Sequence, residues 1–280
     1  LRKAEEVFLR ERPDAVMILG DTNSAIAAVV AERMHIPVYH MEAGNRSFDN
    51  NVPEELNRKM VDHVASFNLP YNDYSMRNLL NEGLHPRRIQ KTGSPVAEVY
   101  SAYKAKIEKS QILEDLKLNK DGYFLVSIHR QENVDLPHRL ELVLNCLRAL
   151  RDHFSLPVLV STHPRTRVRL AALSQENRDG IIFHEPFGYL DYNKLQANAF
   201  CVVSDSGTIS EEASIIGFPA LSIRDSIERP EALETGAMVL TGLNAENLIQ
   251  SVTLVRSLER GPSVPQGYEI SDFSDRVLKF

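Results

Sequence analysis

Hydrophobic and polar positions alternate along the chain between short β-rich runs and longer amphipathic stretches. The runs predict strands at 15–19, 37–41, 67–70, 89–93, 123–128, 157–161, 180–184, 200–204 and 219–223. Apolar residues at helical spacing predict helices between them, among others at 24–34, 54–67, 73–82, 138–154, 166–174, 190–198 and 208–217. Because strands that alternate with helices are typical of βαβ units, we expect an α/β fold with mostly parallel sheets covered on both faces.

The alternation breaks between about 94 and 122, where the sequence is polar and helical, and then restarts. We therefore expect two doubly wound domains, 1–95 and 96–280, with a linker near 94–99. The second domain is expected to end in a helix formed by SDFSDRVLKF. The chain opens inside a helix-like pattern, LRKAEEVFLRERP, so we expect the first domain to be truncated, lacking its first strands.

Composition narrows the classes of function. The chain has 280 residues, 43% of them hydrophobic, and a net charge of −6 without any Lys/Arg run, which argues against nucleic-acid binding. Its apolar runs are far shorter than the roughly 20 residues that a membrane span needs. Cys146 and Cys201 match no metal-ligand spacing, so a reduced, cytoplasmic setting is expected rather than a disulfide scaffold.

Polar residues follow six of the predicted strands, at the edge where parallel α/β sheets bind ligands. These segments are 20–24, 42–44, 129–133, 162–164, 184–186 and 205–208. Each of them alone suits a helix cap or a satisfied turn at least as well as a site. Six together, in two domains, favour a ligand cleft between the domains.

The segment 205–212 opens a helix directly from a strand end. Ser206, Gly207 and Thr208 would present backbone N–H groups and hydroxyls to an anion. Glu212, one turn further, would accept hydrogen bonds from sugar hydroxyls. The alternative is a plain helix N-cap. Neither GxGxxG nor a Walker A sequence is present, which disfavours dinucleotide redox chemistry and NTP hydrolysis.

Two further places carry cationic side chains beside strand ends. His129 and Arg130 would offer a titratable imidazole and a fixed cation to an anionic leaving group, or else a strand-end histidine and a surface arginine. Arg229, which precedes a proline, would clamp a phosphate or carboxylate, or form a surface ion pair. The residues alone leave both choices open.

The stretch 40–60, HMEAGNRSFDNNVPEELNRKM, combines a strand end with a helix start. Its helix allows i,i+4 ion pairs and an apolar stripe, which explain Glu54 and Glu55 structurally: Glu54–Arg58, Glu55–Lys59, Arg58–Asp62, and Leu56, Met60, Val64, Phe67. Glu42 has no such explanation, and Asp21 ends the neighbouring strand. Carboxylates that converge at a sheet edge shift one another's proton affinity, which suits an acid and a base.

Six segments in this order resemble the non-hydrolysing UDP-N-acetylglucosamine 2-epimerase family: GDTNS (20–24), HMEAGNRSFDNNVPEELNR (40–58), KTGSP (91–95), SIHRQEN (127–133), SDSGTISEEA (204–213) and RDSIERPE (224–231). The resemblance implies two Rossmann-like domains in the glycosyltransferase-B arrangement, with a UDP-N-acetylated amino sugar in the cleft. It also implies an isomerase that needs neither a redox cofactor nor a metal, and a homodimer.

The chemistry that the resemblance implies has two steps. The C2 proton and UDP are eliminated, leaving a 2-acetamidoglucal, and UDP then adds back with C2 inverted. The matching positions make Asp21, Glu42 and Glu54 the acid/base candidates, without settling which serves which face, and place His129 by the diphosphate. Six positions match residues that hold UDP: Tyr192, Ser206, Gly207, Thr208, Glu212 and Arg229. Arg130 would lie beside the diphosphate.

Two departures from the commoner family sequence bear on the sugar. Ser-Gly-Thr replaces Ser-Gly-Gly, and GNRSFDNNVPEELNRK replaces a Gly-Leu-Arg-Thr type sequence. Both resemble the branch that makes UDP-N-acetyl-L-fucosamine from UDP-2-acetamido-2,6-dideoxy-L-talose for capsule or O-antigen. The alternative substrate pair is UDP-GlcNAc and UDP-ManNAc. The family's N-terminal Gly-Thr-Arg-Pro-Glu type loop is absent, so we expect little or no activity from residues 1–280 alone.

Other functions remain open on the sequence. A glycosyltransferase-B transferase would need an acceptor, and a hydrolysing epimerase would release free UDP and sugar. A UDP-sugar-binding protein without turnover is the alternative from a different class.

Overall fold

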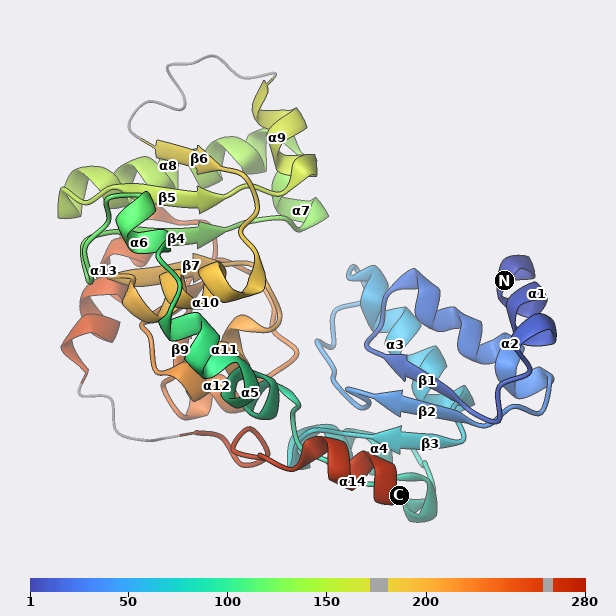
Figure 1. Cartoon of the computed structure of the whole chain (residues 1–280). Helices are drawn as coiled ribbons and strands as arrows, with labels where there is room; N and C mark the ends of the chain where they lie inside the picture. The colour runs from blue at the N-terminus through green and yellow to red at the C-terminus, as the bar shows by residue number, and fades with distance from the viewer. Residues whose placement is uncertain (172–180, 259–263) are drawn as a thin grey trace. The chain divides into compact units, whose positions relative to one another are not determined.

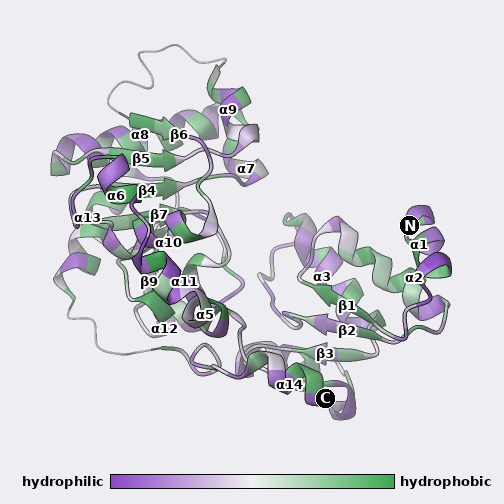
Figure 2. Ribbon diagram, viewed as in Figure 1, coloured by the Kyte–Doolittle hydropathy of each residue, from purple (hydrophilic) through white to green (hydrophobic). Residues whose placement is uncertain are grey.

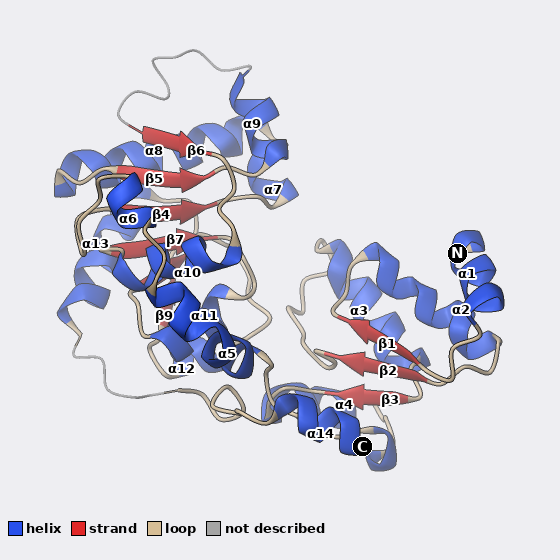
Figure 3. Cartoon of the chain, in the orientation of Figure 1, coloured by secondary structure: helices blue, strands red, loops and turns tan. Residues whose placement is uncertain are grey.

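The computed structural model describes residues 1–171, 181–258 and 264–280 (Figure 1). They divide into two compact units. Unit 1 comprises Leu1–Glu98, Ser226–Glu231 and Pro265–Phe280, and unit 2 comprises Val99–Asp225 and Ala232–Val264. Each unit contains a parallel sheet, of three strands and six strands respectively (Figure 3). The predicted α/β class is therefore confirmed, whereas the domain limits 1–95 and 96–280 stay a prediction.

Unit 1 is built on the sheet β1-β2-β3, with strands Val16–Leu19, Val38–Met41 and Phe67–Leu69. Its other elements in the first 98 residues are α1 (Arg2–Glu11), η1 (Asn23–Ile26), α2 (Ala27–Arg33), α3 (Pro53–Val64), α4 (Asp73–Asn81), η2 (Pro86–Arg88) and the start of α5 (Val96–Glu108). Helices α2 and α3 pack on one face of the sheet through small buried residues that include Ala28, Ala31 and Ala65. Because these side chains are small, the helices lie close to the strand ends, where the candidate site residues described below are found.

The opposite face of this sheet is covered from the end of the chain. Tyr39 stacks on Phe67 with ring centroids 4.9 Å apart, and the ring of Phe280 meets both edge-on. Phe280 directly follows α14 (Phe273–Lys279), the predicted terminal helix. This helix belongs to unit 1 and not, as the sequence predicts, to the second domain, because the segment after it packs on the aromatic side chains of β2 and β3.

The predicted strand at 89–93 is wrong as a regular strand. Only one bridge forms, between Ile89 and Asn68, although Gln90 and Thr92 donate backbone hydrogen bonds to the β3 segment. Gly93 then turns the chain with a φ of +86°. A Cβ there would lie 2.3 Å from the Ile270 side chain, so close packing with the C-terminal segment ends the pairing.

Unit 2 contains the sheet β6-β5-β4-β7-β8-β9. In chain order the strands are β4 (Phe124–Ser127), β5 (Val158–Ser161), β6 (Ile181–His184), β7 (Cys201–Ser204), β8 (Ala220–Ser222) and β9 (Met238–Leu240). The helices are α6 (Ile112–Asp115), α7 (Gln131–Val134), α8 (Pro137–Phe154), α9 (Pro164–Ala171), α10 (Tyr189–Asn198), α11 (Ile209–Ile216), α12 (Glu231–Glu234) and α13 (Ala245–Ser257). The predicted helix 166–174 is confirmed as far as Ala171, and its last residues lie outside the described part.

The strand order explains where unit 2 can bind a ligand. The chain leaves β4 toward β5 and β6, then returns to β7 on the other side of β4. Helices α8 and α13 therefore cover one face and α10 and α11 the other (Figure 1). Such a switch point opens a crevice at the carboxyl ends of the two central strands. The residues that follow β4 and β7 are therefore the candidates for ligand binding in unit 2.

The core of unit 2 is apolar throughout. Val126, Leu147 and Val203 are almost fully buried, and the central strands β4 and β7 are hydrophobic up to the serine that ends each of them (Figure 2). Burial raises the pKa of the Cys146 thiol to about 11, so this cysteine stays protonated and packs as an apolar residue. Among the described residues, no helix is long and apolar enough to cross a membrane.

Candidate active site

In unit 1, two residues with carboxylate side chains follow β1 and β2 at the same edge of the sheet. These strands pair in parallel with Leu19 opposite Met41, so Asp21 and Glu42 leave the sheet at the same edge. The Glu42 Oε2 atom would lie 3.5 Å from a Cβ at Gly20. Asp21 and Glu42 therefore follow neighbouring strands at one edge of the sheet, and the predicted pairing of their carboxylates as acid and base stays a prediction.

Glu42 has an unusual backbone and an asymmetric set of contacts. Its φ is +65°, a left-handed conformation that costs a non-glycine residue free energy. Its Oε1 accepts hydrogen bonds from Arg229 Nη2 at 2.5 Å and Asn45 Nδ2 at 3.2 Å. Within the described residues no hydrogen bond reaches Oε2. One carboxylate oxygen is therefore held, and the other faces Gly20.

Asp21 is held by a buried arginine from α3. Arg58 Nε donates to Asp21 Oδ2 at 2.9 Å, and Nη2 reaches the same oxygen. Nη2 also lies 3.7 Å from Glu228. Burial opposes the charge on Arg58, but Asp21 and Glu228 outweigh it and raise the pKa of the guanidinium. The helical spacing predicts i,i+4 pairs for Arg58, whereas in the structure Arg58 lies at the centre of a cluster of three carboxylates, Asp21, Glu55 and Glu228.

Glu55, the second glutamate of the helix start, is fully buried and organises the preceding loop. It accepts hydrogen bonds from the backbone N–H groups of Ser47 and Phe48 and pairs with Arg58 at 2.7 Å. Burial alone would raise the pKa of Glu55, yet the Ser47 N–H and the Arg58 charge lower it below its usual range. Glu54 is half-buried and, in the described part of the chain, its side chain has neither a hydrogen bond nor an ion pair.

The predicted pattern of α3 is partly wrong. The Glu55–Lys59 pair forms at 3.4 Å, but Arg58 pairs with Glu55 instead of Glu54 or Asp62. Leu56 is 64% exposed and Met60 41% exposed, so the predicted apolar stripe does not face the core. The buried face carries Glu55, Arg58 and Asp62, because it supports polar loops at the sheet edge.

Asp62 and its partners form a buried network that the sequence did not reveal. Its carboxylate accepts hydrogen bonds from Arg46 Nη1 at 2.7 Å and the Gly44 N–H at 3.2 Å, and it contacts His40 Nδ1 at 2.8 Å. Arg46 also forms a bidentate pair with Glu82 at 2.7 and 2.6 Å. The network fixes the turn that carries Glu42. In the sequence, the charged residues on both sides of Gly44 were the only indication of this network.

Gly44 makes this turn possible, and its replacement tests the packing. Its φ is +82°, and an added Cβ would lie 2.2 Å from the Ser75 carbonyl oxygen. We expect Gly44→Ala to lower the free energy of unfolding by about 3 kcal/mol, from left-handed strain and the clash. Gly83→Ala is the matched control, since Gly83 has a φ of +86° but no atom within 4 Å. Equal losses in urea unfolding of the two variants would contradict the packing described.

In unit 2, His129 and Asp205 meet at the switch point. The buried carboxylate of Asp205, after β7, accepts hydrogen bonds from the backbone N–H groups of His129 at 3.1 Å and Arg130 at 3.0 Å. It also accepts one from Asn133 Nδ2 at 3.0 Å. His129 Nδ1 lies 3.2 Å from the same carboxylate, and its ring is 42% exposed. Asp205 therefore orients the imidazole and leaves Nε2 for a ligand.

The ionised carboxylate of Asp205 contributes to the stability of unit 2. Burial raises its pKa, but hydrogen bonds from His129 and Asn133 and the nearby imidazole lower it more, so the pKa lies below its usual value. A lowered folded pKa stabilises the fold above about pH 4 and loses that contribution as the pH falls further.

We expect Asp205→Asn to lower the free energy of unfolding by about 1–3 kcal/mol at pH 7. The difference from the unmodified protein should shrink as the pH falls from about 5 to 2. Urea unfolding across this range measures it. A difference that does not depend on pH would contradict the lowered pKa.

The predicted anion loop lies beside this pair. Ser206 Oγ and Thr208 Oγ1 are 3.0 Å apart, and Thr208 Oγ1 donates to Glu212 Oε1 at 2.9 Å. Gln196 on α10 donates to Glu212 Oε2 at 2.6 Å. The pKa of Tyr192, also on α10, is raised by burial and by the charge of Glu212. Five predicted substrate-binding residues therefore gather around the start of α11: Tyr192, Ser206, Gly207, Thr208 and Glu212.

The two predicted arginines behave differently. Arg130 Nε donates to the Asp205 carbonyl oxygen at 2.9 Å, and its Nη2 would lie 3.9 Å from a Cβ at Gly207, so it borders the loop. Arg229 instead belongs to unit 1 and pairs with Glu42. The predicted role of Arg229 in holding UDP stays a prediction.

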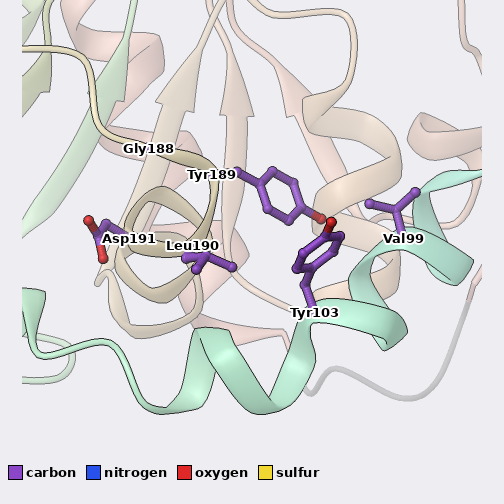
Figure 4. Close-up of a pocket in the computed structure, with 6 residues that line it drawn as sticks. All are labelled: Val99, Tyr103, Gly188, Tyr189, Leu190 and Asp191. Atoms are coloured by element: carbon purple, nitrogen blue, oxygen red, sulfur yellow. The ribbon is translucent and has the colours of Figure 1, made fainter.

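A separate cavity of about 510 Å³ lies in unit 2 between α5 and the start of α10. Its wall includes Tyr103 and Tyr189, whose rings meet edge-on with centroids 5.8 Å apart (Figure 4). None of the predicted site residues is among those that line it. Among the described residues, no group of three or more His, Cys, Asp or Glu side chains is arranged to hold a metal ion.

Comparison with known proteins identifies the family. The sequence profile of the family described as UDP-N-acetylglucosamine 2-epimerase matches residues 1–279. The UDP-N-acetylglucosamine 2-epimerase of Methanocaldococcus jannaschii is 36% identical over 275 residues, which are 95% of this chain and 75% of the relative. The UDP-2,3-diacetamido-2,3-dideoxy-D-glucuronate 2-epimerase of Pseudomonas aeruginosa is 34% identical over 254 residues, 90% of this chain and 70% of the relative.

Two solved structures are similar over 99% of this chain. The UDP-N-acetylglucosamine 2-epimerase of Rickettsia bellii has a TM-score of 0.91 at 41% identity, and 76% of its chain is covered. The Methanocaldococcus jannaschii enzyme in complex with UDP-GlcNAc and UDP has a TM-score of 0.92 at 35% identity, and 78% of its chain is covered.

Proposed function

Because the chain belongs to the UDP-N-acetylglucosamine 2-epimerase family, we propose that it inverts C2 of UDP-GlcNAc to give UDP-ManNAc, and catalyses the reverse reaction. The observation that carries the proposal is the pair of carboxylates at the ends of β1 and β2, with Glu42 Oε2 directed at Gly20. Relatives named for this activity, one of them solved with UDP-GlcNAc and UDP, support the substrate.

The two units supply different parts of the chemistry. In unit 1, a carboxylate takes the C2 proton while the bond between C1 and the UDP oxygen breaks, giving 2-acetamidoglucal and UDP. A second carboxylate returns a proton to the opposite face as UDP adds back to C1. The candidates for these two carboxylates are Asp21, Glu42 and Glu54. Arg58 engages one oxygen of Asp21, and Arg229 engages one oxygen of Glu42.

In unit 2, the loop 206–208 and the start of α11 suit the diphosphate, since N–H groups and the positive helix end favour an anion. His129, oriented by Asp205, would stabilise or protonate the departing diphosphate. Tyr192 and Glu212 would hold the nucleoside. Buried cysteines in the core support a cytoplasmic setting, and a homodimer follows only from the resemblance.

A second substrate is favoured by one observation, the sequence of residues 45–51 together with Thr208. Both resemble the UDP-N-acetyl-L-fucosamine branch, whose substrate is UDP-2-acetamido-2,6-dideoxy-L-talose. Asn45 contacts Glu42, and Thr208 contacts Glu212, so both differences lie against proposed site residues. The reaction at C2 would be the same.

The test is incubation of the full-length protein with each sugar nucleotide in turn, without an acceptor, followed by ¹H NMR. A C2-inverted sugar nucleotide supports the epimerase, and the nucleotide that is converted identifies the substrate. Stoichiometric release of UDP and free sugar would instead indicate a hydrolysing enzyme. Turnover only with an added acceptor would indicate a transferase, and binding of both nucleotides without turnover would indicate a binding protein.

A further inference from the structure

Asn45 is a buried amide whose two ends have different partners. It is 3% exposed, its Nδ2 donates to Glu42 Oε1 at 3.2 Å, and its Oδ1 accepts from Ser75 Oγ at 2.7 Å. A carboxylate oxygen only accepts hydrogen bonds, so the NH₂ end must face Glu42 and the carbonyl end must face Ser75. The orientation of this amide is therefore determined by its neighbours.

The first turn of α4 anchors the other end of this chain of hydrogen bonds. Ser75 is 2% exposed, and its backbone N–H donates to the N-cap residue Asn72 at 2.9 Å. Asn78, one turn later, donates to the Gly44 carbonyl oxygen at 3.0 Å. The turn from Glu42 to Asn45 is thus attached to a helix at two points, which helps to maintain the left-handed φ of Glu42.

We propose that Asn45, itself held by Ser75, is a positioning residue for Glu42. Together with Arg229 it occupies Oε1, so that the side chain has one rotamer and Oε2 is the oxygen that exchanges the C2 proton. The inference rests on the proposed epimerase function and adds to it a reason why one oxygen of Glu42 reacts. Asn45 itself need not touch the substrate.

The amide-to-acid variant Asn45→Asp tests the proposal with almost no change in volume. It keeps an acceptor for Ser75 but replaces the donor to Glu42 by a repelling carboxylate. We expect kcat for C2 epimerisation to fall roughly tenfold or more, the loss typical of a hydrogen bond to a charged group. KM should stay within about twofold, because the proposed UDP-binding loop lies on other elements.

Ser75 provides an independent pair of variants. Ser75→Ala removes the hydroxyl that orients Asn45 and should lower kcat with little change in KM, whereas Ser75→Thr keeps a hydroxyl and should retain most of the activity. The matched control is Asn81→Asp, because Asn81 is an exposed amide at the end of α4, outside the stretch 45–51. This control should leave kcat unchanged.

The outcomes separate this proposal from the function on which it rests. Absence of epimerisation by the unmodified protein overturns both. If the unmodified protein is active, then Asn45→Asp with unchanged kcat overturns the positioning role alone. If Asn45→Asp does not fold, the Ser75 pair decides, and equal kcat in Ser75→Ala and Ser75→Thr overturns the proposal.

Discussion

Glu42→Gln is expected to lower the rate of C2 proton exchange by about 10²- to 10⁴-fold, the usual contribution of a positioned acid or base. The amide keeps a carbonyl oxygen for Arg229 and Asn45, so the local packing should survive. UDP binding, which we assign to residues of unit 2, should be unaffected. Deuterium incorporation at C2 and calorimetric titration with UDP measure the two effects.

The control for this variant is Glu6→Gln, which removes an exposed carboxylate from α1. It should change neither exchange nor UDP binding. Exchange at the unmodified rate in Glu42→Gln would remove Glu42 from the mechanism. Loss of UDP binding together with exchange would show that the variant acts through structure instead.

Arg58→Met is expected to lower the free energy of unfolding by about 3–5 kcal/mol, because it leaves buried carboxylates without their shared cation. Glu55 is fully buried, and the side chain of Glu228 is 5% exposed. Activity should fall as well, since Asp21 would lose its partner. Urea unfolding at pH 7 measures the loss of stability.

The pH dependence of this loss has a definite sign. The lowered pKa of Glu55 stabilises the fold above about pH 4, and this contribution is lost as the pH falls. The difference between Arg58→Met and the unmodified protein should therefore shrink between about pH 5 and 3. Lys59→Met is the matched control, because Lys59 is 37% exposed and its loss should cost about 1 kcal/mol or less. Similar losses in both variants would contradict the central role of Arg58.

Much of the fold was predictable, because apolar runs and helical spacing report directly on parallel α/β structure. The strands β1 to β8 follow the predicted runs within a residue or two at either end. The strand β9 was not predicted, since its three residues, MVL, carry too weak a signal. The local sequence pattern also predicted a regular strand at 89–93 that does not form, because the close approach of Ile270 determines the structure there.

The candidate site was only partly predictable. Strand-end position located Asp21, Glu42 and His129, because the ends of parallel strands meet at one edge. The sequence could not show that Arg229 pairs with Glu42 from 187 positions away, nor which member of the Glu54–Glu55 pair faces inward. These contacts depend on tertiary packing, and spacing along the chain does not encode them.

The most direct test of the account is ¹H NMR of the full-length protein in D₂O with UDP-GlcNAc and, separately, the 6-deoxy-L-talosamine nucleotide. Removal and return of the C2 proton by a side chain requires solvent deuterium to enter at C2. We predict deuterium at C2 together with inversion for one of the two nucleotides, and its loss in Glu42→Gln. Absence of exchange on both substrates would contradict the proposed epimerase.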